Sequence, residues 1–118
     1  MIKTELYKNI RQILVDNVSA PVESIFNWGT PRNQVTMENL LRSTANVLFD
    51  THFCSQSIFT LRLTVSGVKG FNRDKLVEEV RTALSNSQIN IVDYEEFDDD
   101  LEINGNFYYR TILTVSIR

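Results

Sequence analysis

The sequence predicts an α+β fold, in which one domain holds a small mixed sheet with helices packed on it. Three observations predict this class. Apolar residues recur at helical spacing in three segments, three further segments read as strands, and the second half has the order β-α-β-β. A chain of 118 residues suits one domain. We divide it into an N-terminal helix (1–18), an irregular loop (19–36) and a core (37–118).

Residues 4–17 are expected to form an amphipathic helix. Thr4 is a suitable N-cap, and Pro21 lies just beyond the expected end. The apolar residues stack on one face at spacings of one, three and four: Leu6, Ile10, Ile13 and Leu14.

The loop 19–36 is long for a compact domain, and it holds both prolines and the one tryptophan. Such connections are usually functional or carry local structure of their own. Phe26 and Trp28 are too large and apolar to lie wholly in water. We expect them either to pin the loop to the core or to bind a partner.

A second helix is predicted over residues 37–50, with Thr36 as its N-cap. Its positions follow helical spacing: Met37, Leu40, Leu41, Thr44, Val47 and Leu48. An alternative is that the end of this segment, 47–49, is already extended.

The second half begins with a strand over 58–66, where apolar and polar residues alternate. Gly67 and Gly70 bracket a turn, and Asn72 is expected to cap a helix over 73–85. Its apolar face is formed by Leu76, Val77, Val80, Ala83 and Leu84.

Two further strands are expected over 89–97 and 107–117, with Asn104-Gly105 as the turn signal between them. These two strands can pair as an antiparallel hairpin. The helix before them predicts a right-handed crossover from strand 58–66 to a parallel or next-but-one neighbour, with helices mainly on one face of the sheet.

The composition argues against most catalytic chemistry. One cysteine and one histidine leave little material for a disulfide, a cysteine-based metal cluster or a histidine-based site. A Cys–His pair of His52 and Cys54 is conceivable, but no motif supports its activation. The nucleophile elbow, the P-loop, G-x-G-x-x-G and H-E-x-x-H are all missing from the sequence. We expect no cofactor, and neither a signal peptide nor a membrane span.

The net charge of −3 hides an uneven distribution. Six acidic residues fall within eight positions: Glu95, Glu96, Asp98, Asp99, Asp100 and Glu102. Three interpretations remain open: a solvated hairpin tip, a site for a hard cation, or an acidic projection that meets a basic patch on a neighbouring copy.

Nucleic acid is disfavoured as a partner by the acidic total. Gly67-x-x-Gly70 before a helix is a weak phosphate-binding signal, with Lys69 and Arg73 nearby. Aromatic residues at 107–109 could stack on bases, although aromatic residues are also ordinary in strands.

The order of elements resembles that of the tail terminator proteins of tailed phages, also called tail-completion or neck proteins. The likeness lies in an N-terminal helix, TELYKNIRQILVDNV, a sheet crossed by a helix, and a closing strand, YYRTILTVSIR. The chain departs from that layout at residues 37–50, where an early strand would be expected. The resemblance implies a ring, typically a hexamer, that caps the tail tube and joins it to the head.

The chain is also similar to the small baseplate-wedge or sheath-initiator proteins of phages. LVEEVRTALSNSQINIVDYEEF followed by FYYRTILTVSIR carries this likeness. The E-P-R element of that family is replaced here by Ser87-Gln88-Ile89. Neither family is enzymatic, so both resemblances imply a structural role.

We therefore predict a non-enzymatic structural protein of the virion, assembled in the host cytoplasm. Its predicted partners are further copies of itself and tail-tube, sheath or neck/connector proteins, without membrane contact. The predicted interface residues are Phe26, Trp28, Asp98, Asp99, Asp100, Tyr108 and Arg110. The alternative is a small α+β module that binds a ligand at residues 67–72, or binds RNA through Lys69 and Arg73.

Overall fold

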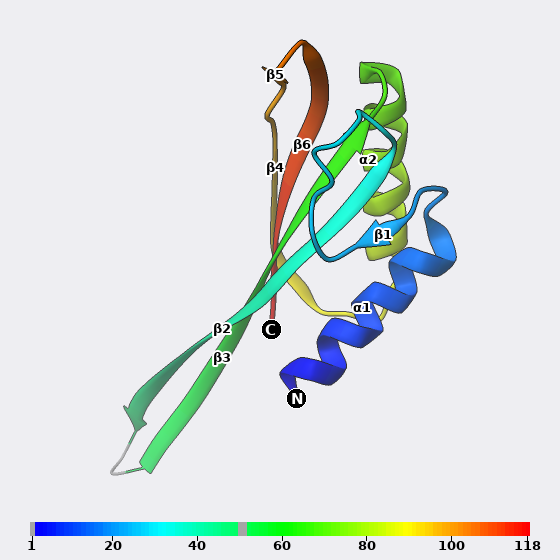
Figure 1. The fold of residues 1–118 in the computed structure, drawn as a ribbon. Coiled ribbons are helices and arrows are strands. Elements are labelled where there is room, and N and C mark those ends of the chain that lie inside the picture. The colour runs from blue at the N-terminus through cyan, green and yellow to red at the C-terminus, as the bar shows by residue number, and fades with distance from the viewer. Residues whose placement is uncertain (1, 50–51) are drawn as a thin grey trace.

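Two long strands set the shape of the molecule, seen in a computed structural model. β2 (Gln34–Phe49) and β3 (His52–Gly67) pair antiparallel along their whole length. The structure describes residues 2–49 and 52–118, and the side chains of 2–44 and 57–118. Figure 1 shows the pair running from the helices at one end to an isolated tip at the other.

The sheet has the strand order β1-β2-β3-β6-β4, with β5 paired to β6. The shorter strands are β1 (Val22–Glu23), β4 (Ile91–Asp98), β5 (Leu101–Ile103) and β6 (Asn106–Ile117). β6 is antiparallel to both β3 and β4, so β3 and β4 run parallel with β6 between them. The predicted next-but-one neighbour is confirmed.

Both helices, α1 (Lys3–Asn17) and α2 (Gly70–Ser85), lie on one face of the sheet (Figure 1). Alternation along β3 and β6 points one apolar row at them. Those residues are buried: Phe59, Leu61, Leu63, Val65, Leu113, Val115 and Ile117. They meet Leu6, Ile10 and Leu14 of α1 and the predicted apolar face of α2 in one core. The predicted α+β class is confirmed.

The helix predicted over 37–50 is wrong, because this segment is strand β2. A β-bulge explains the misleading spacing. Met37 pairs with Leu63 and Leu40 pairs with Leu61, so β2 uses one residue more than β3 over this stretch. Met37 and Leu40 thereby reach the same core face at a spacing of three, which imitates a helix.

The predicted caps are also corrected. α1 begins at Lys3 after Ile2 rather than at Thr4, and α2 begins at Gly70 after Lys69 rather than at Asn72. Neither N-terminus has a side-chain cap. The loop predicted over 19–36 holds the short strand β1 and the first residues of β2.

The outer part of the β2–β3 pair projects from the body, and we call it the arm (residues 43–49 and 52–58). β6 pairs with β3 only from Phe59 onwards. In the described part of the chain, the arm strands therefore pair only with each other. The molecule measures 60 × 28 × 20 Å and has a radius of gyration of 16.3 Å. A compact domain of this length would have about 13 Å.

Candidate interaction surface

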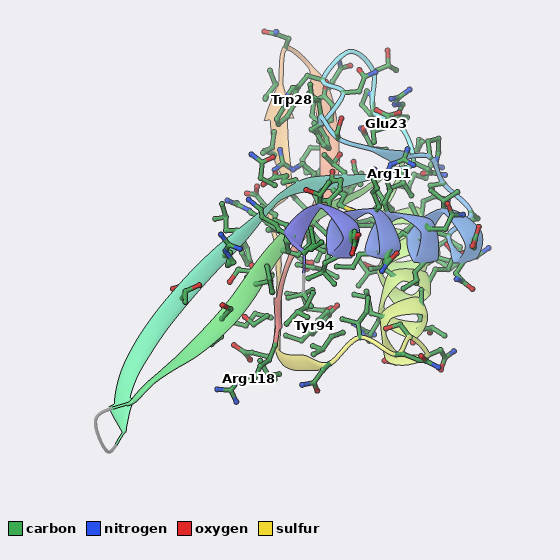
Figure 2. All side chains as sticks on the ribbon, turned by 90° about the horizontal axis from the view of Figure 1, so that it is seen from below. Arg11, Glu23, Trp28, Tyr94 and Arg118 are labelled. Atoms are coloured by element: carbon green, nitrogen blue, oxygen red, sulfur yellow. The ribbon has the colours of Figure 1, made fainter. Side chains whose placement is uncertain are left out.

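The seven predicted interface residues gather at one end of the sheet, away from the arm. Tyr108 connects the loop to the sheet, because its hydroxyl donates a hydrogen bond of 2.5 Å to the carbonyl oxygen of Trp28. The Trp28 ring packs edge-on against Tyr108, with centroids 5.3 Å apart, and against Phe26, at 4.4 Å. Tyr108 is buried, whereas Trp28 is 46% exposed. Figure 2 places Trp28 near the free end of the sheet.

Arg110 completes this aromatic group. Its guanidinium carbon lies 4.7 Å from the centroid of the Phe26 ring and 4.9 Å from that of Trp28. Such cation–π contacts contribute roughly 0.5–2 kcal/mol. Arg110 and Tyr108 alternate along β6 with residues of the core, so this cluster lies on the sheet face opposite the helices.

The loop that carries Phe26 and Trp28 is held by polar contacts. The side-chain amide of Gln34 donates to the carbonyl oxygen of Asn27 and accepts from the backbone N–H of Asn27, both at 3.2 Å. Asn33 accepts a hydrogen bond of 2.9 Å from the backbone N–H of Val68. Phe26 is half-buried against Trp28, Tyr108 and Arg110 rather than in the core between the sheet and the helices. Trp28 keeps an accessible face, so binding of a partner through it stays a prediction.

The three consecutive aspartates are bound to arginines of the same chain. Asp99 forms an ion pair of 3.2 Å with Arg110. Asp100 accepts from the backbone N–H of Arg110 at 3.1 Å and from the guanidinium of Arg73 at 2.5 Å. Asp98 accepts from the hydroxyl of Thr111 at 2.8 Å. The three aspartates therefore connect β4, β6 and α2, and we call them, together with Arg73, the bracket.

Arg73 is the member of this site that sequence reasoning placed elsewhere. Its side chain is 9% exposed and also donates to Asp74 and to the carbonyl oxygen of Arg110. Burial acts to lower the pKa of the Arg73 guanidinium, but the hydrogen bond to Asp74 and the charges of Asp100 and Asp98 outweigh it and raise that pKa. The sequence does contain an indication of this role. Six carboxylates at 95–102 without a lysine or arginine among them require cations from elsewhere in the chain.

The Gly67-x-x-Gly70 turn lets β3 and α2 approach closely. A Cβ on Gly67 would overlap the backbone nitrogen of Arg73. At Gly70 the nearest side-chain atom, on Tyr109, would lie at an ordinary 3.7 Å. The first glycine is therefore explained by packing, and the donors of Arg73 are directed at carboxylates and a carbonyl rather than at solvent.

A hollow lies between the C-terminal half of α2 and β4, and we call it the β4 groove. It encloses about 700 Å³ and is lined by Arg81, Leu84, Ser85, Ile89, Asn90, Ile91, Tyr94 and Glu96. A neighbouring hollow of about 690 Å³ shares Ile89 and Asn90 and continues along α1. The ligand site predicted at residues 67–72 does not coincide with either hollow.

The rim of the β4 groove is a small polar network. Tyr94 donates a hydrogen bond of 2.6 Å to Glu96, and Arg81 pairs with both Glu96 and Glu78. Burial, together with the hydrogen bond and charge of Glu96, raises the pKa of Tyr94. These contacts hold the side chains of the rim in place. Figure 2 labels Tyr94 below α1 in the view.

Other proposed chemistry finds no site in the part of the chain that is described. There, no three or more His, Cys, Asp or Glu side chains gather in a way that could hold a metal ion. The side chains of His52 and Cys54 lie outside the described residues. No described helix is long and apolar enough to cross a membrane.

Comparison with known proteins gives a structural neighbour. No family model matches the sequence, and no curated protein matches it. The fold is similar to that of a chain in the virion of a native gene transfer agent particle, with a TM-score of 0.61 and 12% identity. The likeness covers 96% of this chain and 92% of the other. At this identity it shows a common fold.

Proposed function

We propose that this protein is a structural subunit of a phage-like particle. The observation that carries the proposal is the fold likeness to a virion chain over nearly the full length of both proteins. The elongated outline and the projecting arm are consistent with it, since they offer a long surface for contact with other chains. The protein works without a cofactor and is not an enzyme.

More finely, we propose a tail terminator or neck subunit that forms a ring, with six copies expected, and joins the tail tube to the head. Strand β2 supports this assignment, because it supplies the early strand that the terminator layout has. Tail-tube, sheath or neck/connector proteins are its proposed partners. The exposed face of Trp28 and the aromatic group around it form the surface proposed to meet them.

The test is the mass of the assembly. Size-exclusion chromatography with light scattering, run over a concentration series with and without tail-tube protein, should give a species of six times the 13.7 kDa chain. Electron microscopy of that species should show closed rings. A strict monomer under every one of these conditions would contradict the ring proposal.

The proposed tail role also predicts that the exposed aromatic surface around Trp28 binds tail-tube protein. Trp28→Ala should weaken binding to the tail-tube protein, because truncating an aromatic anchor commonly costs over 2 kcal/mol of binding free energy. Phe71→Ala, at an exposed position of α2, is the matched control. Equal effects of the two changes would argue against the aromatic surface.

A further inference from the structure

The arm is a structure that needs a partner. A two-stranded ribbon is marginally stable in water, because neither strand has a second neighbour. Residues 43–58 contain one aspartate and one histidine but no lysine or arginine. Residues 47–49 are Val, Leu and Phe. Natural proteins usually protect free strand edges with charge, above all lysine, and this ribbon has almost none.

The opposite edge of the sheet is free as well. Within the described residues β4 pairs only with β6, so its other edge offers unpaired backbone groups. Strand β4 contains Asp93, Glu95, Glu96 and Asp98 but no lysine or arginine. Arg81 pairs with Glu96, and Arg73 lies 3.9 Å from Asp98, so among the described residues Asp93 and Glu95 are the carboxylates of β4 without an ion pair. Beside it lies the β4 groove, whose apolar wall includes Leu84, Ile89 and Ile91.

Charge distinguishes two possible contacts between copies, β4 with β4 and the arm with β4. Two β4 strands from two copies would bring Asp93 and Glu95 of each copy together, four carboxylates without an ion pair among the described residues, and like charges on facing strands are destabilising. An arm carries no such cluster, so it can add to β4 without repulsion. The favoured contact therefore joins unlike surfaces, arm to β4, and unlike contacts generate rings when the rotation closes.

We propose that the backbone of the arm of one copy adds to the free edge of β4 on the next copy, beside the β4 groove. Strand addition of this kind takes affinity from main-chain hydrogen bonds and specificity from adjoining pockets. This inference rests on the proposed ring and names the surfaces that form it. The arm and the edge of β4 are separate surfaces of one chain, so every copy can donate its arm to one neighbour and accept the arm of another.

Cross-linking tests the contact directly, because Cys54 in the arm is the only cysteine of the chain. Val92→Cys adds a thiol at the bulge of β4, where the side chain is 49% exposed. A short bismaleimide should then link successive copies into a ladder of multimers. Phe71→Cys, 77% exposed at the start of α2, is the control and should give at least tenfold fewer links.

Mixed samples show whether the link joins different copies. A Cys54→Ser, Val92→Cys protein mixed with the wild type should yield cross-linked dimers, which neither protein forms alone. Equal yields for Val92→Cys and Phe71→Cys would overturn the arm-to-β4 contact.

Shortening the arm separates this inference from the proposed function. Replacing residues 47–54 by Asn-Gly places a two-residue turn between the paired Asn46 and Ser55. The shortened protein should keep the circular dichroism of the wild type and elute as a monomer. If it still forms the wild-type ring, the arm contact is wrong and the ring stands. If the wild type itself is always a monomer, the ring proposal fails first.

Discussion

The inner end and the arm of the β2–β3 pair share the same backbone pairing but differ in the packing around it. At the inner end, the helices cover one face of the strands and β6 continues the sheet. The loop that carries Trp28 packs on the other face, at Tyr108 of β6. At the arm, each of the same two strands pairs only with the other, within the residues that the structure describes. Apart from the bulge after Met37, backbone pairing continues from the inner end into the arm, whereas packing against the helices and β6 stops there.

This difference indicates that burial of apolar side chains, rather than the hydrogen bonds between β2 and β3, provides most of the stability of the hairpin. Net hydrogen-bond contributions are small, roughly 0.5–1.5 kcal/mol each, whereas burial of an apolar side chain contributes about 1.5–3 kcal/mol. We therefore expect substitutions to lose effect from the inner end outwards. The arm is held in the free subunit by little, which suits a segment that gains its packing on assembly.

The largest effect is expected for Leu63→Ala. Leu63 is fully buried between the helices and β6, and its truncation leaves a cavity. Such changes cost about 2–5 kcal/mol. Urea unfolding followed by circular dichroism measures the loss in the free energy of unfolding. The arm-shortened protein is the comparison and should lose less than about 1 kcal/mol. A similar loss in both proteins would remove the distinction between the two ends.

Gly67→Ala should come next, at a cost of about 1–3 kcal/mol, because the added methyl group overlaps the backbone of Arg73 and forces β3 from α2. Gly70→Ala is the matched control. Its Cβ has space, and a smaller unfolded-state entropy should make it neutral or up to about 1 kcal/mol stabilising. Thermal unfolding of the pair should show opposite shifts in Tm, or at least a clear loss for Gly67→Ala alone.

Arg73→Met removes the cation that bridges Asp74, Asp98 and Asp100. We expect about 1–3 kcal/mol, the usual cost of leaving hydrogen-bonded groups without their partner. Arg81→Met provides the control, since that side chain is 43% exposed and surface ion pairs contribute only about 0–1 kcal/mol. Urea unfolding at neutral pH ranks the two. Should Arg81→Met cost more, the bracket around Arg73 would not be what fixes the end of the sheet.

Much of the fold could be predicted because local pattern and final packing agree there. The alternation at 58–66 survives unchanged in β3, and the apolar spacing of 4–17 appears as the buried face of α1. Asn104-Gly105 forms the predicted turn, with φ of 51° and 80° at the two residues, values that asparagine and glycine tolerate best.

The remainder could not be predicted because it depends on contacts far apart in the sequence. Strand β2 is specified by its pairing with β3, and the bulge after Met37 shifted its apolar period towards that of a helix. The sequence predicts Asp98 and Asp100 as interface residues, whereas the structure pairs them with Arg73, which lies 25 residues or more away with nothing local to link them. The joining of Trp28 to Tyr108 spans 80 residues.

Tyr108→Phe removes one oxygen atom and so tests the hydrogen bond between β6 and the loop that carries Trp28. Removing the hydroxyl deletes the hydrogen bond to the carbonyl oxygen of Trp28 and should cost about 1 kcal/mol. Trp28 is the only tryptophan, so its fluorescence reports the loop directly. We expect emission to shift to longer wavelength as the ring becomes more exposed. An unchanged spectrum and stability would mean that ring packing alone fixes the loop.

The smallest effect is expected for Thr44→Ala at the base of the arm. The hydroxyls of Thr44 and Ser57 lie 3.0 Å apart across the two strands, both in exposed surroundings. Water replaces such a hydrogen bond when it is lost, so the free energy of unfolding should change by less than about 0.5 kcal/mol. Ser57→Ala and the double variant complete a cycle whose coupling should be equally small. A coupling above about 1 kcal/mol would show that the arm is stabilised by its own cross-strand pairs, and the need for a partner to order it would disappear.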